Sequence, residues 1–155
     1  MSGRVVIGVG NVYRGDDGVG LSVASLVRGR VPADVAVLEC EQEPTRLLDA
    51  WEGTDVAVVV DACAAGGPPG SVHRFDVSSD PLPARGFRSS THAFGVGDAV
   101  ELARALHRLP SRVVVYGVEG VAFDTGAPMS GTVQGAAALV AAAIVRDLET
   151  EQHGA

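Results

Sequence analysis

Hydrophobic residues along the chain fall into two kinds of pattern. Arg4–Gly10 and Asp55–Val60 are continuous apolar runs, which are typical of strands buried on both faces of a sheet. Gly18–Gly29 and Phe94–His107 instead space their apolar residues three or four positions apart, which predicts amphipathic helices. The two patterns alternate along the chain, so strands are expected to alternate with helices.

The alternation continues to the C-terminus. Further strands are predicted at Val35–Glu39, Val72–Val77 and Arg112–Val118, and further helices at Pro44–Trp51 and Gly131–Leu148, while Ser78–Thr91 is predicted as a long surface loop and Glu149–Ala155 as a frayed tail. Strands that alternate with helices form mostly parallel sheets. We therefore expect a three-layer α/β/α fold with a sheet of about five strands. The short alternating stretch Val72–Val77 is expected at an edge and can be antiparallel.

Composition limits the possible partners. The 155 residues predict a single domain over 1–155, with 12 basic residues against 19 acidic ones. Because there is no basic run, a nucleic-acid partner is not expected. Cys40 and Cys63 make no disulfide framework, which favours a cytoplasmic protein. The longest apolar run, Ala136–Val145, is too short to cross a bilayer, so no membrane partner is expected.

Three polar residues lie where such a sheet binds ligands, beyond the carboxyl ends of its strands. Asp17 follows the first strand, Asp61 comes directly after the third, and His92 closes the long loop before a helix. Two carboxylates and an imidazole can hold Zn, Ni, Co, Mn or Fe(II). Each residue also has an ordinary structural explanation, since Asp16 or Asp17 can cap a helix and Asp often follows a strand.

A nucleotide- or cofactor-binding module is one alternative. Gly8-Val9-Gly10 after a strand begins like a dinucleotide fingerprint, and Glu39 can mimic the acid that binds a ribose. Tyr13, however, occupies the position of the third glycine. The fingerprint is therefore incomplete.

A thiol nucleophile is a further alternative, because Cys63 lies two residues past Asp61 and can pair with His92. A free cysteine next to a buried strand more often packs as a small hydrophobic residue. We favour the packing role.

The segment Val6–Gly20, VIGVGNVYRGDDGVG, resembles the opening of the nickel–iron hydrogenase maturation proteases. These small endopeptidases remove the C-terminal extension from the precursor of the hydrogenase large subunit. The resemblance continues, in order, through VVVDA at Val58–Ala62, the turn Pro69–Gly70, SSTHAFGVGDAVELA at Ser89–Ala103, VVVYGVE at Val113–Glu119 and the helix start Met129–Val133. It covers nearly the whole chain, with one departure at Gly120, where many members have Pro.

The resemblance implies roles for the same three residues. Asp17, Asp61 and His92 match the metal-contacting positions of the family, and Asp17 and Asp61 are the candidate catalytic residues, either as general base or as ligands of a metal that activates water or the scissile carbonyl. Nickel is expected to arrive on the precursor, with no tightly bound organic cofactor. The protein is expected to act as a monomer on that precursor. A non-catalytic hydrogenase assembly factor stays open as an alternative.

Overall fold

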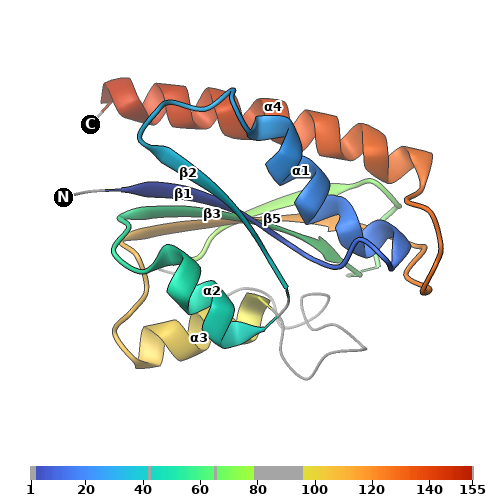
Figure 1. Ribbon diagram of the computed structural model, residues 1–155, viewed down its shortest axis with the longest axis horizontal. Helices are drawn as coiled ribbons and strands as arrows, with labels where there is room; N and C mark the ends of the chain where they lie inside the picture. The colour runs from blue at the N-terminus through green and yellow to red at the C-terminus, as the bar shows by residue number, and fades with distance from the viewer. Residues whose placement is uncertain (1–2, 42, 65, 79–95, 155) are drawn as a thin grey trace.

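A five-stranded sheet lies between two layers of helices (Figure 1). The structure is a computed structural model that describes residues 3–41, 43–64, 66–78 and 96–154. The strands are β1 (Arg4–Val9), β2 (Val35–Cys40), β3 (Val56–Cys63), β4 (Val72–Asp76) and β5 (Arg112–Glu119). The helices are α1 (Val19–Val27), α2 (Pro44–Trp51), α3 (Val96–Ala105) and α4 (Gly131–Gly154), with a 3-10 turn η1 (Gly15–Gly18) before α1.

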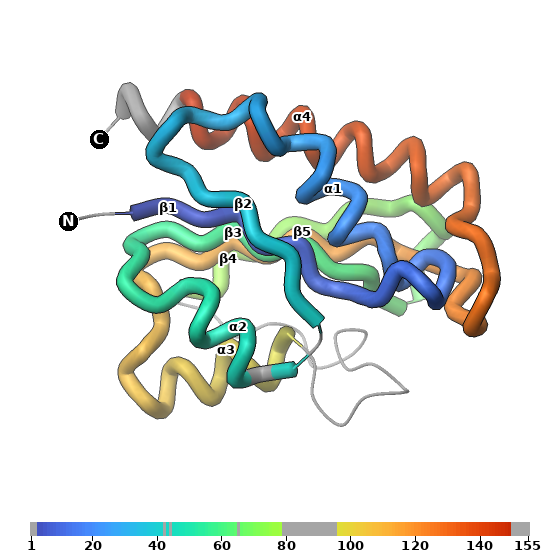
Figure 2. The backbone as a smooth tube through the Cα atoms, in the orientation of Figure 1, coloured from blue at the N-terminus to red at the C-terminus, as the bar shows by residue number. Residues whose placement is uncertain are grey.

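The sheet has the order β2-β1-β3-β5-β4. The first four of these strands are parallel to one another, and β4 pairs with β5 in the antiparallel direction. Helices α1 and α4 cover one face, and α2 and α3 cover the other (Figure 2). The predicted three-layer fold with a mostly parallel sheet and one antiparallel edge strand is therefore confirmed.

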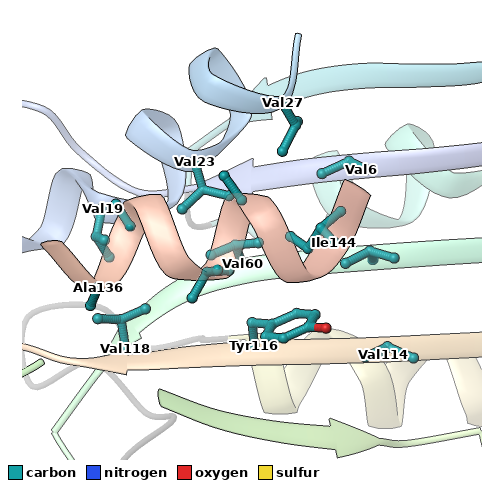
Figure 3. Packing of buried hydrophobic residues seen from close by; sticks show 14 of the residues in the cluster. Val6, Val19, Val23, Val27, Val60, Val114, Tyr116, Val118, Ala136 and Ile144 are labelled. Atoms are coloured by element: carbon teal, nitrogen blue, oxygen red, sulfur yellow. The ribbon is translucent and has the colours of Figure 1, made fainter. Parts of the chain in front are cut away.

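Each face of the sheet has its own hydrophobic core. Along β3, Ala57 and Val59 pack under α2 and α3, whereas Val58 and Val60 pack under α1 and α4. Figure 3 shows the second core, in which Val60 and the neighbouring strand residues lie beneath Ile144 of α4. This alternation is the period of two that a strand buried on both faces requires.

The carboxyl end of β3 differs from the prediction. The strand was expected to stop before Asp61, yet it continues to Cys63. Strand β1 pairs with β3 only as far as Val60, but β5 goes on pairing, with Asp61 opposite Gly117. Hydrogen bonding to one neighbouring strand is enough to continue a strand, so β3 extends along β5 alone. Asp61 therefore lies inside β3, one residue past the end of its pairing with β1.

Helix α4 is longer than predicted. The segment expected to fray, Glu149–Ala155, instead continues the helix to Gly154. Within α4, Gly131–Glu149 has the length and mean hydropathy, 1.2, of a membrane-spanning helix, with 39% of that window buried in the protein. The face of α4 that contains Val140 and Ile144 packs against the sheet. This packing explains much of the apolar composition of the helix.

Candidate active site

Asp17 lies in η1, between the end of β1 and the start of α1. The chain leaves β1 at Gly10, where a Cβ would lie 2.0 Å from the carbonyl oxygen of Asp17. The same oxygen accepts a hydrogen bond of 3.1 Å from the Asn11 N–H. Asp17 is only 6% exposed. The end of β1 therefore holds the backbone of Asp17 directly against the sheet.

The start of α1 lies directly on the backbone of β1 and β3. A Cβ on Gly20 would lie 2.4 Å from the carbonyl oxygen of Val9 and 2.3 Å from that of Val60. Val60 is the residue before Asp61. This close approach brings η1, and Asp17 with it, to the carboxyl end of β3 where Asp61 lies.

Asp61 is 3% exposed, and its Oδ1 accepts a hydrogen bond of 2.8 Å from the Ala62 N–H. Asp61 also affects Cys40 in β2. The pKa of the Cys40 thiol is raised to about 11, first by burial and next by the nearby negative charge of Asp61. Cys40 pairs with Val9 at the end of β1. The Asp61 carboxylate therefore lies at the carboxyl ends of three neighbouring strands.

The two aspartates lie at the topological switch point of the sheet. From β1 the chain crosses to β2 on one side, whereas β3 lies on the other side of β1. Sheets of this kind bind ligands in the crevice outside the carboxyl ends of their strands at such a point. The third predicted ligand, His92, lies outside the described residues.

The prediction that Asp16 or Asp17 caps α1 is wrong. Gly18 occupies the N-cap position, and no side chain caps this end of the helix.

Asp16 has a structural role that sequence reasoning missed. It is fully buried, and its carboxylate accepts hydrogen bonds from the N–H groups of Val121 (2.8 Å), Ala122 (2.9 Å) and Ser130 (2.8 Å) and from the Ser130 hydroxyl (3.0 Å). Burial by itself would raise the pKa of Asp16, but these hydrogen bonds together lower it below its ordinary value. Asp16 ties η1 to the loop before α4, which fixes the position of its neighbour Asp17.

Gly120, where many family members have Pro, lies directly against Asp16. A Cβ at this position would be 2.8 Å from the Asp16 Cβ and 2.7 Å from Cζ of Phe123. Glycine therefore allows the loop after β5 to approach Asp16 closely.

The features that suggested a nucleotide site have structural explanations. A Cβ on Gly8 would lie 2.2 Å from the carbonyl oxygen of Gly20, so this glycine permits helix α1 to approach the strand. Glu39 forms an ion pair of 3.2 Å with Arg28. Gly10 makes the close approach to Asp17 described above. None of the three needs a nucleotide to explain it.

The fold is that of an α/β protein, with a buried acidic pair, Asp17 and Asp61, at the switch point of its sheet as a candidate ligand site. Residues 22–147 match the HycI family model, described as hydrogenase maturation protease. The chain therefore belongs to the hydrogenase maturation proteases, a family of peptidases. The matched residues include Asp61 and His92, and begin after Asp17.

Individual relatives agree with this assignment. The HupD hydrogenase expression/formation protein of Thiocapsa roseopersicina is 31% identical over 122 residues, which make up 77% of this chain and 55% of that protein. The chain thus spans little more than half of this relative. HupD of Rhodobacter capsulatus is 28% identical over 149 residues, 93% of this chain and 70% of that protein.

Solved structures share the fold. The crystal structure of the [NiFe] hydrogenase maturation protease HycI from Thermococcus kodakarensis is 27% identical, with a TM-score of 0.75, and the match covers 96% of this chain and 93% of that one. The hydrogenase maturating endopeptidase HybD from E. coli reaches a TM-score of 0.82 at 20% identity, covering 97% and 94% of the two chains. At that identity, HybD supports the fold alone.

Proposed function

We propose that this protein is an endopeptidase that removes the C-terminal extension from the nickel-loaded precursor of a nickel–iron hydrogenase large subunit. The observation that carries the proposal is the buried pair Asp17 and Asp61 at the switch point of a hydrogenase maturation protease fold. The family supplies the reaction class, and the two carboxylates supply the site.

The chemistry of the pair suits a metal that comes with the substrate. Two buried carboxylates at one end of a sheet are costly to keep ionised, and a divalent cation stabilises both of them. We propose that Asp17, Asp61 and His92 bind nickel that is already held by the precursor. Three protein ligands leave coordination positions for the groups of the substrate. No tightly bound organic cofactor is part of this proposal.

Peptide hydrolysis consumes one water molecule. The water oxygen bonds to the scissile carbonyl carbon, the C–N bond breaks, and the new amine takes a proton. Asp17 or Asp61 can accept the proton of the attacking water as general base. Alternatively, both carboxylates would hold nickel brought by the precursor, and the chemistry that this ion would supply is polarisation of the carbonyl or activation of the water.

We also propose that the protein acts as a monomer in the cytoplasm, without a nucleic-acid or membrane partner. The net charge of −7 and the lack of a basic run support the exclusion of nucleic acid. The packing of α4 against the sheet supports a helix that belongs to the core.

The test is a cleavage assay with nickel-loaded precursor. Intact-mass analysis should show that the wild-type protein shortens the precursor at its C-terminus and that Asp17→Asn does not, although this variant keeps the volume of the side chain. A precursor that stays full-length while it binds the wild-type protein would contradict the proposal and support a non-catalytic assembly factor. Nucleotide binding detected by thermal shift would support the cofactor-binding module instead.

A further inference from the structure

Three side chains that commonly bind metals meet at the carboxyl end of the sheet, on strands β3, β4 and β5. They are Cys63, His73 and Glu119, and their ligand atoms all lie within 4.8 Å of one another. The ring nitrogen Nε2 of His73 is 3.0 Å from Oε1 of Glu119. This cluster shares no residue with the candidate site formed by Asp17 and Asp61.

The register of the strands brings these residues together. Cys63 pairs with Glu119 across β3 and β5, and His73 of β4 pairs with Gly117 of β5. Glu119 and Gly117 are two positions apart, so they point to the same face of the sheet. Gly117, which has no side chain, pairs with His73 on one side and with Asp61 on the other.

The three side chains are held in place. Cys63 and Glu119 are each 2% exposed, while the His73 side chain is 33% exposed and leaves an approach from solvent. The His73 ring stacks on Phe75, with ring centroids 6.3 Å apart. A Cβ on Gly67 would be 3.4 Å from Oε1 of Glu119, so the loop after β3 covers this carboxylate.

We propose that Cys63, His73 and Glu119 form a second cation site, for Zn²⁺, with a fourth coordination position open to solvent at His73. A thiolate with an imidazole favours Zn²⁺ over Mg²⁺ or Ca²⁺. Tetrahedral Zn²⁺ with ordinary bond lengths places its nitrogen and oxygen ligands about 3.4 Å apart. The His73–Glu119 separation therefore needs to widen by only a few tenths of an ångström.

The simpler explanation is an ion pair between His73 and Glu119. In that explanation Cys63 packs as a small residue of the hydrophobic core under α2 and α3, whereas in a metal site its sulfur is a ligand. Co²⁺ distinguishes the two, because it occupies Zn²⁺ sites and a thiolate ligand gives it a charge-transfer absorption in the near ultraviolet. The carboxylates and imidazole of the Asp17–Asp61 site cannot produce this band.

The experiment is a Co²⁺ titration of the full chain after treatment with a chelator, and it requires no precursor. The wild-type protein should develop the charge-transfer band at one equivalent, and Zn²⁺ should remove it. Cys63→Ser should abolish the band. His73→Gln and Glu119→Gln should weaken Co²⁺ binding at least about tenfold, since each removes a direct ligand.

The other cysteine of the chain is the matched control. Cys40 lies close enough to Asp61 for the charge of the carboxylate to affect its thiol. Both Cys40→Ser and Asp61→Asn should keep the band. Absence of the band in the wild-type protein, or a band that survives Cys63→Ser, would overturn the proposal. Addition of Zn²⁺ should also raise the Tm of the wild-type protein but not that of Cys63→Ser, which checks the site without relying on a spectrum.

Discussion

Gly10 and Asp17 are in direct backbone contact: a Cβ added to Gly10 would lie 2.0 Å from the carbonyl oxygen of Asp17. The Gly10 N–H also donates a 3.1 Å hydrogen bond to the carbonyl oxygen of Cys40 in β2. The backbone at Gly10 is therefore fixed by β2 on one side and by η1 on the other. The position of Asp17 depends on the absence of a side chain seven residues earlier.

Gly10→Ala should lower both stability and activity. The new methyl group meets a backbone oxygen rather than a flexible side chain, so η1 has to move away from β1. We expect the free energy of unfolding to fall by roughly 3 kcal/mol, and precursor cleavage to be lost with the position of Asp17. Chemical denaturation and the cleavage assay measure the two effects.

Gly135→Ala is the matched control for this substitution. Gly135 is exposed on α4, and a Cβ there meets nothing within 4 Å. Alanine is the better helix former, so this variant should gain about 0.5–1 kcal/mol. If Gly10→Ala proved as stable as Gly135→Ala, the close contact at Gly10 would not exist in solution.

Asp61→Asn should fold normally but fail to process the precursor. The amide keeps the side-chain volume and an oxygen that can accept the hydrogen bond from Ala62, yet it removes the negative charge. We expect the cleavage rate to fall at least about 100-fold, the scale of a lost general base or metal ligand. Circular dichroism and a cleavage time course provide the two measurements.

Asp55→Asn is the control on the same part of the chain. Asp55 is exposed just before the start of β3, at the opposite end of the strand from Asp61. This variant should cleave at the wild-type rate. Near-normal cleavage by Asp61→Asn would remove Asp61 from the site.

Cleavage should depend on nickel in the precursor. If the carboxylates of this protein recognise nickel held by the substrate, the ion joins two half-sites and accounts for most of the difference in affinity between loaded and unloaded precursor. Nickel-free precursor should stay full-length, and loading it with nickel should start the reaction. Efficient cleavage of nickel-free precursor in the presence of a chelator would mean that Asp17, Asp61 and His92 do not recognise a metal.

Asp16→Asn should lower stability at neutral pH by roughly 2–3 kcal/mol, because a buried carboxylate that accepts four hydrogen bonds is replaced by an amide. The pKa of Asp16 in the folded protein lies below its ordinary value of 3.8. Its stabilising contribution is therefore complete above that value and is lost as the pH falls through the lowered pKa.

The pH dependence separates this role from general damage to the fold. Below pH 4, the wild-type protein should lose stability more steeply than Asp16→Asn, so the difference between them should shrink in acid. Urea unfolding from pH 7 down to pH 3 measures this difference. The exposed residue Asp124 provides the control, since Asp124→Asn should match the wild-type protein throughout. A constant difference between Asp16→Asn and the wild-type protein would contradict the assigned role of the charge.

Local patterns in the sequence were sufficient to predict most elements of the fold. Helix α2 begins and ends where its pattern predicted, at Pro44 and Trp51, and β1 and β2 agree to within a residue. The reason is that burial on one or both faces of an element produces its own hydrophobic period. The order of strands and helices was enough to place Asp17 and Asp61 at the carboxyl ends of the sheet before their contacts were known.

Only the tertiary structure decided the features that depend on contacts between distant segments. Strand β3 extends past Val60 because β5 continues beside it, and the apolar pattern of β3 holds no information about that partner. Asp16 finds its hydrogen-bond donors more than a hundred residues away, so its sequence neighbourhood suggested only a helix cap. The register of three strands brings the ligand atoms of Cys63, His73 and Glu119 within 4.8 Å of one another. A sequence records which residues favour burial and turns, whereas register and close backbone contacts are set only when the packed elements meet.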